Sequence, residues 1–500
     1  MPPPSAVAEP RSTEDPKPDT RLLVVVLLIA SALRVPLAFW PNFHHPDEIF
    51  QYLEPAWRML GHDGIISWEW RHGVRSWLLP TMLSAPVAIG DWIAPGGPGA
   101  FIAPRILAAL ASLSIVVSAW TFGARVSPRH AVLAGFVTAI WFELVYFAPH
   151  TLSEPVAAAI FLPAALLLTR DPPSQRTLLA AGALLALAFL LRIQFAPAIV
   201  VLILWASWRN PARLTPVMLG GIAVLSLGGL FDAAHEAVPF GWILANVDQN
   251  LVKGRAAGFG VSPADAYPFW IWSAWSVAAV PLGFAIYRGY RHAPVLFWIA
   301  VINIAAQTPI AHKEYRFIFL SVALFVILAA LGSADWTEPR RDAGHRWPRL
   351  LLATGWISVS VVLAVSGRMP ELWMRGVGAA NLAATLKSDS EMCGLALYDV
   401  PFFLLPGRDR LAGNASLFAL YSTDPLARGR LDQATLAASA SFNRILAERT
   451  AERNLPDGFA RKSCDTVGGR PICIFVRDGS CRSGEVSAFT LNEVLKRVDL

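Results

Sequence analysis

Long apolar segments constrain this chain more than any other feature. Segments of roughly 16 to 21 residues with almost no charge recur along the first three quarters of the sequence, and a helix of that length crosses or nearly crosses a bilayer. The spacing of these segments predicts eleven transmembrane helices, at 21–40, 102–122, 131–148, 153–169, 177–191, 193–208, 216–231, 268–287, 292–310, 316–333 and 349–366.

Composition supports a multi-pass integral membrane protein. Hydrophobic residues make up 55% of the chain and charged residues 16%, whereas about a quarter of a soluble domain is charged. The net charge of +6 does not indicate nucleic-acid binding, because the arginines stand singly between apolar segments and form no basic cluster. Residues 1–20 are polar and Pro-rich, and we expect them to form a disordered cytoplasmic tail.

The positive-inside rule predicts the topology. A twelfth apolar segment, 77–95, contains two prolines and an aspartate, and it either crosses the membrane or lies along its surface. If it lies along the surface and the N-terminus is cytoplasmic, all five short basic loops fall on the cytoplasmic side, as the rule requires. These loops are at 123–131, 169–176, 208–213, 287–292 and 338–349.

This topology places nearly every unusual polar segment on the opposite, external face. They are the loop 41–101 with its interfacial helices, the residues around Glu154 and Arg192, the long loop 232–267 and "HKEYRF" at 312–317. Several loops at one end of a helical bundle commonly build a catalytic pocket. We therefore expect an active site on this face.

The loop that begins "HHPDEIFQ" contains the strongest catalytic candidate, Asp47. Pro46, Asp47 and Glu48 also form a good helix start, because proline and acidic residues both suit a first turn. The spacing predicts an amphipathic surface helix with Asp47, Gln51, Glu54 and Arg58 on one face. In the functional reading, Asp47 is ionised and accepts a proton from a hydroxyl nucleophile. Farther along the loop, Trp68, Trp70 and Trp77 either anchor it at the interface or stack on a sugar.

"HKEYRF" contains four ionisable groups at a membrane boundary: His312, Lys313, Glu314 and Arg316. Their side chains either extend from the membrane boundary toward water or bind the phosphate of a leaving group and neutralise its negative charge. Arg192 has the same two readings, since it lies between two short apolar segments. Glu154 precedes a proline and suits helix initiation.

Metal binding has weaker support in this sequence. His44, His45, Asp47 and Glu48 are ligand types, but no H-x-x-x-H pair or cysteine set accompanies them, so we predict no metal site. No cofactor is predicted, and a divalent cation, Mg or Mn, is left open. The sequence also has no Gly-rich phosphate loop that would indicate a soluble nucleotide-sugar site.

The ordered motifs resemble a known family. "HPDEIFQYLEP", "WEWRHGVRSWLLP", "FDAAHEAVPFGWILANVDQNLVKGRAAGFGVSPADAYPFW" and "HKEYRFIF" are similar to motifs of the Alg9/GPI mannosyltransferase group, glycosyltransferase family 22, over about residues 22–335. The resemblance implies the GT-C fold, a multi-helix membrane bundle. It also implies transfer of mannose from a polyprenyl (dolichyl) phosphate mannose to a glycolipid or lipid-linked glycan acceptor, on the lumenal or external side.

The resemblance assigns roles to individual residues. Asp47 becomes the catalytic base of an inverting single displacement, with Glu48 positioning the acceptor or substituting for the base. Other matching positions bind or orient substrates. The resemblance implies donor-phosphate binding by His312, Lys313 and Arg316, with Glu314 orienting the cations, and it includes Arg75 and Asn250 as recurrent polar positions. From their own readings, Arg192 joins the donor-phosphate candidates, and Trp68, Glu69 and Glu154 join the candidates that bind or orient substrate.

Several alternatives stay open. Arginine and alanine are abundant and lysine is scarce, which suggests a bacterial source and an inner-membrane location, whereas a eukaryotic source would imply the endoplasmic reticulum. The sugar could then differ from mannose. A lipid or glycan transporter would need ionisable groups near mid-membrane and inverted repeats, and neither is evident in the sequence. A noncatalytic lipid-glycan binding protein would not need the acidic motif.

The predicted domains are the tail, a catalytic membrane domain at 21–368 and an extracytoplasmic soluble α+β domain at 369–500. Strand-like "GLALYDVPFFLL" and "PICIFVRD" flank "SFNRILAERTAERNL", which reads as a helix. A turn at Gly468-Gly469 would set Cys464 opposite Cys473, close enough for a disulfide, although free thiols are the alternative for all four cysteines, Cys393, Cys464, Cys473 and Cys481. Asn414 begins a glycosylation sequon.

Overall fold

The computed structural model describes residues 19–235, 237–337, 347–413, 415–420, 439–481 and 487–499. The predicted disordered tail lies almost wholly outside the described residues, as do Asn414 with its sequon and most of the predicted basic loop 338–349.

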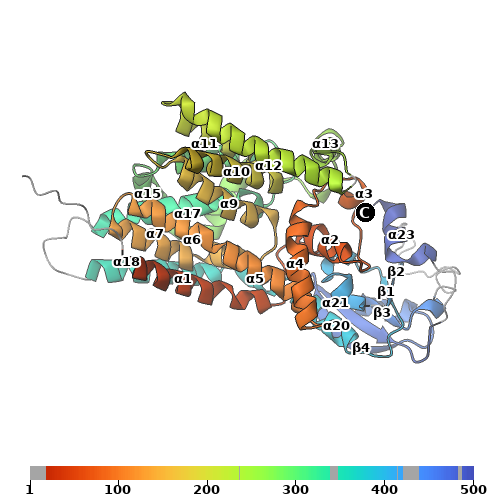
Figure 1. The fold of residues 1–500 in the computed structure, drawn as a ribbon. Coiled ribbons are helices and arrows are strands. Elements are labelled where there is room, and N and C mark those ends of the chain that lie inside the picture. Colours follow the sequence, from red (N-terminus) through yellow and green to blue (C-terminus); the bar gives the residue numbers. More distant parts are fainter. Residues whose placement is uncertain are drawn as a thin grey trace, which may run out of the picture.

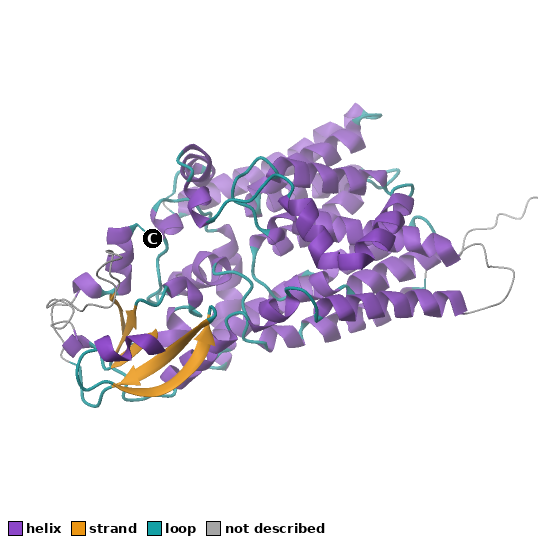
Figure 2. Cartoon of the chain, turned by 180° about the vertical axis from the view of Figure 1, so that it is seen from behind, coloured by secondary structure: helices purple, strands orange, loops and turns teal. Residues whose placement is uncertain are grey.

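A long bundle of helices occupies one end of the molecule, and a small sheet with its own helices lies at the other (Figures 1 and 2). The longer helices of the bundle run roughly along a common direction (Figure 1). The bundle contains α1 (Thr20–Arg34), α5 (Gly99–Ala111), α6 (Leu113–Ala124), α7 (Pro128–Ile140), α8 (Phe142–Phe147), α9 (Ser153–Leu168), α10 (Gln175–Leu191), α11 (Ala196–Ser207), α12 (Leu214–Ala234), α14 (Ala266–Trp275), α15 (Ala279–Gly289), α16 (Pro294–Gln307), α17 (Phe319–Ala334) and α18 (Trp347–Ala364).

Each predicted transmembrane segment falls on one helix or on consecutive helical pieces. In the described residues five continuous helical stretches are long and apolar enough to cross a membrane on their own, and a bent pair, Arg349–Ala364 with Met369–Lys387, makes a sixth. Shorter apolar helices cover much of the remainder. The chain is thus a multi-pass membrane protein, and the count of eleven spans stays a prediction.

Some helices of the bundle pack closely at glycines, where the backbones of two neighbouring helices come together. A Cβ atom at Gly289 of α15 would lie 1.9 Å from the carbonyl oxygen of Leu328 in α17, and one at Gly182 of α10 would lie 1.9 Å from that of Val217 in α12. Small residues are typical of helix contacts in membranes, because packing replaces the hydrophobic effect there. The helix α17 is buried along most of its length and forms the centre of the bundle.

The loop 41–101 folds into short helices at the end of the bundle that faces the sheet (Figure 1). They are the π-helical turn η2 (Glu48–Leu53), α2 (Glu54–Met59), α3 (Trp68–Arg71) and α4 (Leu78–Ile93). The expected helix after Asp47 forms, but it is not an amphipathic surface helix. Glu48, Gln51 and Glu54 are buried together with the apolar residues. Glu48 packs against His150 of the bundle, Gln51 against Ser67 and Arg75 of the same loop, and Glu54 against Arg408 of the C-terminal domain, so the face that was expected to meet solvent is covered from several sides.

The C-terminal domain is α+β, as predicted. Its sheet has the order β2-β1-β3-β5-β4, with β1, β2 and β3 mutually parallel and β5 antiparallel to both β3 and β4. The strands are β1 (Gly394–Tyr398), β2 (Ser416–Leu420), β3 (Arg444–Glu448), β4 (Ala460–Val467) and β5 (Arg470–Val476), and the helices are α19 (Met369–Met374), α20 (Val377–Lys387), α21 (Arg408–Ala412) and α23 (Leu491–Val498).

Two expectations for this domain have opposite outcomes. The turn at Gly468-Gly469 has positive φ at both residues, and Cys464 pairs with Cys473 across the β4–β5 hairpin in a disulfide, as predicted. The other two cysteines, Cys393 and Cys481, form a second disulfide. The helix expected within 441–455 is wrong: Arg444–Glu448 is β3, because this segment is buried at the centre of the sheet, where strand pairing on both sides outweighs its helix propensity.

Candidate active site

Arg316 is the centre of an ion-pair network. It lies in the 3-10 turn η8 (Tyr315–Ile318) before α17, and its side chain is 2% exposed. Its Nη2 donates to Asp47 Oδ2 at 2.8 Å and its Nε donates to Glu314 Oε2 at 2.8 Å. Its Nη1 lies 3.3 Å from Glu154 Oε1, a charge contact without hydrogen-bond alignment. Three predicted carboxylates from distant segments thus meet at one predicted cation.

Asp47 lies at the start of η2, and its side chain is 16% exposed. Burial opposes its ionisation, but the nearby charges of Arg316, His45 and Arg75 outweigh burial and hold the pKa of Asp47 well below its usual range. His45 Nδ1 lies 3.2 Å from Oδ1, and Arg75 Nη2 lies 3.9 Å from Oδ2. Asp47 is therefore an ionised carboxylate, still partly open to a substrate.

Glu48 has a different environment from its neighbour. Its side chain is fully buried, and Oε1 accepts hydrogen bonds from the backbone N–H groups of His44 and His45, at 2.6 and 3.4 Å. Its Oε2 lies 2.9 Å from Nδ1 of His150, a buried residue between α8 and α9. Glu48 thus fastens the turn that carries Asp47 to the bundle and faces away from any open space.

The residues of "HKEYRF" divide between two tasks. Glu314 bridges His312 Nε2 at 3.0 Å and Arg316, and despite burial the positive charge of Arg316 holds the pKa of Glu314 well below its usual range. The hydrogen bond to Glu314 raises the pKa of His312. Lys313 is buried, and its Nζ donates to the carbonyl oxygens of Ser262 and Ile310 at 3.0 and 2.6 Å. Its ammonium therefore fastens the loop before α14 in this arrangement.

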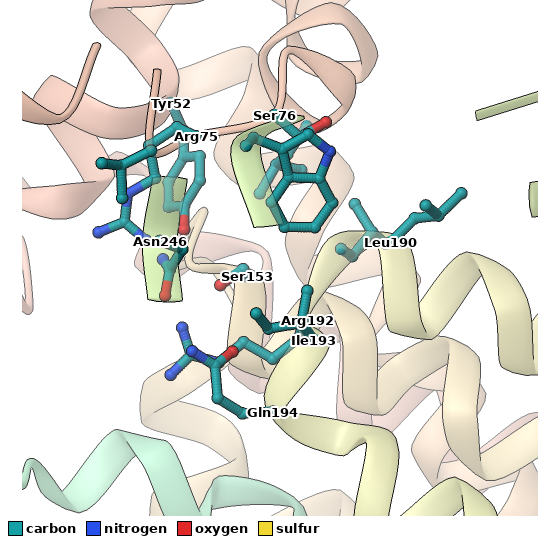
Figure 3. Close-up of a pocket in the computed structure, with 13 residues that line it drawn as sticks. Tyr52, Arg75, Ser76, Ser153, Leu190, Arg192, Ile193, Gln194 and Asn246 are labelled. Atoms are coloured by element: carbon teal, nitrogen blue, oxygen red, sulfur yellow. The ribbon is translucent and has the colours of Figure 1, made fainter. Parts of the chain in front are cut away.

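A small pocket of about 40 Å³ opens beside this network (Figure 3). Arg75 and Tyr52 lie together with Asn246 on one side of it, and Arg192 and Gln194 lie on another (Figure 3). The remaining lining residues are Val74, Ser76, Leu79, Ser153, Leu190, Leu191, Ile193 and Trp242. Two guanidinium groups that line one pocket from different sides favour an anionic ligand.

Glu154 connects the pocket to Asp47. Arg192 Nη2 lies 3.1 Å from Glu154 Oε1, which also contacts Arg316, and Arg316 binds Asp47. Glu154 lies in the first turn of α9, where the helix dipole stabilises a carboxylate, so its structural reading as a helix-start residue also holds. Arg192 follows the last residue of α10 and lies over the ring of Phe317.

The remaining predicted residues lie around the rim. Glu69 Oε1 is 3.9 Å from Nη2 of Arg75, and Nε of Arg75 donates to Gln51 Oε1 at 3.3 Å. Trp68 is buried, with Phe259 stacked 6.2 Å from it and the Arg255 guanidinium 5.0 Å from its ring centre. These partners occupy the ring faces that were expected to meet a sugar.

Asn250 lies in the π-helical turn η5 (Asp248–Val252), whereas Asn246 of the preceding helix α13 (Gly241–Val247), about one helical turn earlier, lines the pocket. Sequence reasoning did not single out Asn246, Tyr52, Ser153 or Gln194. Ser153 and Gln194 each lie within two residues of a predicted site residue, and the four-residue spacings from Glu48 and from Asn250 could have indicated Tyr52 and Asn246.

The four candidate metal ligands turn to different partners within the described residues. Asp47 and His45 face each other and the Arg316 network, His44 Nδ1 pairs with the Tyr146 hydroxyl at 3.1 Å, and Glu48 binds backbone N–H groups and His150. Their contacts are those of an ion-paired loop.

The backbone defines the class first: a multi-helix membrane protein of the GT-C fold. It is similar to crystal structures of ArnT from Cupriavidus metallidurans. The structure bound to undecaprenyl phosphate has a TM-score of 0.60 at 12% identity and covers 91% of this chain and 97% of that one. The apo structure has a TM-score of 0.59 at 14% identity, with the same coverage. At these identities the likeness concerns the fold alone.

Residues 25–377 match the Alg9-like mannosyltransferase family, and the chain belongs to this family. It is therefore a membrane mannosyltransferase. GPI mannosyltransferase 3 of Yarrowia lipolytica is 26% identical over 373 residues, which are 70% of this chain and 68% of that protein. The same enzyme of Aspergillus fumigatus is 26% identical over 447 residues, covering 75% of this chain and 56% of its own. That of Trypanosoma brucei brucei is 38% identical over 80 residues, covering 16% and 14%.

These comparisons confirm the family expected from the motifs, and the match extends past the C-terminal end of the predicted 22–335, to residue 377. The relatives named above are eukaryotic, from fungi and a trypanosome, so they do not support the bacterial source suggested by composition.

Proposed function

We propose that this protein transfers mannose from a polyprenyl phosphate mannose to a hydroxyl group of a glycolipid or lipid-linked glycan, with inversion at the anomeric carbon. The observation that carries the proposal is the arginine-lined pocket beside an ionised, partly exposed carboxylate. Such a site combines a base with arginines that can bind an anion, all within one ion-pair network. Two comparisons support this donor: the relatives are GPI mannosyltransferases, and ArnT, which shares the fold, was crystallised with undecaprenyl phosphate.

The chemistry divides among the residues as follows. The acceptor hydroxyl oxygen attacks the anomeric carbon while Asp47 takes the hydroxyl proton, and the bond from that carbon to the phosphate oxygen breaks. Because the pKa of Asp47 is well below its usual range, proton transfer follows once attack has made the hydroxyl acidic. The charge left on the polyprenyl phosphate is stabilised by Arg192 and Arg75, with Arg316 and His312 nearby.

The other predicted residues hold this geometry. Glu48 and Lys313 fasten the two loops that carry Asp47 and Arg316, while Glu314 and Glu154 orient Arg316. Glu69 orients Arg75, and Trp68 with Asn250 shapes the rim. The enzyme acts on the lumenal or external side, which for a chain like its eukaryotic relatives is the lumen of the endoplasmic reticulum.

Radiolabelled transfer tests the proposal. Membranes containing equal amounts of wild type, Asp47→Asn or the control Asp63→Asn are incubated with polyprenyl phosphate mannose and lipid acceptors; Asp63 is in the same loop, and its side chain is 87% exposed. We expect about a hundredfold or greater loss in Asp47→Asn and little change in the control, in line with the usual contribution of a general base.

Two results would contradict different parts of the proposal. Undiminished transfer by Asp47→Asn would exclude the base. A wild type that transfers another sugar from its polyprenyl phosphate, and not mannose, would overturn the donor.

A further inference from the structure

A second cluster of ionisable side chains lies at the other end of the bundle. His130 is in the first turn of α7, His292 is in the connection between α15 and α16, and Asp335 directly follows α17. Because α17 begins just after Arg316 and has 16 residues, its far end is about 24 Å from the ion-pair network of the active site. The two clusters are therefore separate.

The three side chains converge on one point. Nε2 of His130 lies 3.0 Å from Oδ1 of Asp335, and Nε2 of His292 lies 2.9 Å from the same oxygen. The two imidazole rings are 5.0 Å apart, and one potential ligand atom from each of the three residues lies within 4.8 Å of the others. In a tetrahedral zinc site, ligand atoms at about 2.0 to 2.1 Å from the metal are about 3.3 Å from each other. Shifts of a few tenths of an ångström in the two Nε2–Oδ1 distances would reach that spacing.

The surroundings also suit a metal. His130 is buried, and its Nδ1 lies 2.8 Å from the Ser127 hydroxyl oxygen, which can accept a hydrogen bond from Nδ1–H and so leave the Nε2 lone pair facing the cluster. A hydrogen bond at the outer nitrogen is typical of metal-binding histidines. Arg288 Nη2 lies 3.4 Å from the other carboxylate oxygen of Asp335, so it orients that carboxylate without contacting Oδ1 at hydrogen-bond distance.

We propose that His130, His292 and Asp335 bind one divalent transition-metal ion of the zinc class, with water completing the tetrahedron. The donor set favours such an ion, because two imidazoles and one carboxylate suit zinc and do not suit magnesium or calcium. The ion joins three helix termini that are far apart in sequence, and it stabilises the end of the bundle opposite the active site. It takes no part in the transfer reaction.

The measurement is metal content of the full chain purified in detergent. After removal of metal with a chelator, the protein is incubated with zinc chloride, dialysed and analysed for bound zinc. We expect about one zinc ion per wild-type chain, and its loss in both His292→Gln and Asp335→Asn. Glutamine can still donate a hydrogen bond to Asp335, so His292→Gln keeps the side-chain contact while removing the imidazole ligand. The control is His312→Gln, since His312 is paired with Glu314 in the active-site network and could bind zinc there.

Thermal unfolding and cobalt absorption provide second readouts that do not depend on activity. Zinc should raise the melting temperature of wild type and of His312→Gln but not of His292→Gln, and cobalt should give the visible spectrum of a tetrahedral ion only where zinc binds. Wild type that retains no zinc, or zinc that is retained by His292→Gln and lost in His312→Gln, would overturn the proposal and leave the cluster as a hydrogen-bonded contact.

Discussion

Arg316 holds carboxylates that would otherwise repel one another. Asp47, Glu314 and Glu154 reach it from three separate segments, and the second cation near Glu154 is Arg192. Each carboxylate therefore depends on the same guanidinium for its charge compensation. A phosphate that attracts Arg192 or Arg316 would weaken this compensation, so donor binding and the basicity of Asp47 are coupled through these arginines.

The first prediction concerns the pH dependence of transfer. A base is active only when it is deprotonated, and the pKa of Asp47 is held well below its usual range, so activity should persist when the pH is lowered from 7 to 5. Arg316→Gln removes the main lowering charge, which raises the pKa of Asp47 and should move the acid limb of kcat/KM to higher pH, with a lower plateau. The check is a pH profile against Arg213→Gln, which removes a cation that pairs with the exposed Asp171. An unmoved acid limb in Arg316→Gln would contradict the coupling.

A second prediction concerns stability and Glu54. This buried carboxylate accepts hydrogen bonds from the backbone N–H groups of Ile65 and Arg408, and so joins the loop 41–101 to the C-terminal domain. Burial raises the pKa of Glu54 to about 7 from 4.5. The folded state therefore binds the proton more tightly than the unfolded state, and stability should fall as the pH rises from 4.5 to 7, by roughly 3 kcal/mol in total.

Thermal unfolding in detergent between pH 5 and pH 8 measures this effect. The fall in melting temperature across that range should be smaller in Glu54→Ala, whose own stability at pH 5 is lower because two backbone N–H groups lose their acceptor. Glu371→Ala is the control, since Glu371 is largely exposed. An equal pH dependence in wild type and Glu54→Ala would exclude Glu54 as the source.

The sequence identified the residues of the network better than it identified their contacts. Asp47, Glu314 and Arg316 were singled out in charged motifs of the predicted external face, Glu154 was singled out beside a proline on the same face, and the four converge. Sequence spacing cannot show where a flexible side chain ends, however. The ammonium of Lys313 binds two carbonyl oxygens, and Asn246 lines the pocket where Asn250 was expected, because these contacts depend on packing between distant segments.

At the scale of elements, the C-terminal helix α23 supports the active-site loop. Asn492 donates from Nδ2 to the carbonyl oxygen of Gly64 and accepts at Oδ1 from the N–H of Ile66, both at 2.9 Å. Near the end of the helix, His72 Nε2 lies 2.8 Å from Asp499 Oδ1, and Arg255 also pairs with Asp499. The helix thus connects the two loops that flank the rim of the site.

The third prediction is that Asn492→Ala loosens this loop. The substitution leaves the Gly64 carbonyl and the Ile66 N–H without their side-chain partner, at a cost of about 1 to 3 kcal/mol if they stay buried. Hydrogen exchange at residues 61–67 should become faster, while exchange in β5 should not change. Asn381→Ala is the matched control, because Asn381 binds Asp465 on the exposed side of the domain. Unchanged exchange at 61–67 would show that other contacts hold the loop.

Two local sequence signals were sufficient to predict elements of the fold. Apolar length predicted the positions of the membrane helices, and two consecutive glycines predicted the β4–β5 hairpin, since both signals are local. The strand β3 was read as a helix, because its neighbours β1 and β5 lie about 25 to 50 residues away in sequence.

At the scale of the whole molecule, charge is distributed along the bundle with a clear polarity. The Arg316 network and the C-terminal domain lie at one end, and the described basic loops, including those with Arg213 and Arg288, lie toward the other. The positive-inside rule places the loops rich in Lys and Arg in the cytoplasm. The active site and both disulfides then lie outside the cytoplasm, where disulfides persist.

The fourth prediction follows from this polarity and tests the topology directly. All four native cysteines are in disulfides, so a single added cysteine reports on one position. In sealed vesicles of known orientation, Asp63→Cys should react with an impermeant maleimide only from the lumenal or external side. Ser174→Cys, in the basic loop between α9 and α10, should react only from the cytoplasmic side. Because both positions are exposed, equal labelling after detergent permeabilisation serves as the control. Labelling of Asp63→Cys from the cytoplasmic side would contradict the assignment of the site to the lumenal or external face, and labelling of Ser174→Cys from the lumenal or external side would contradict the cytoplasmic assignment of the basic loop.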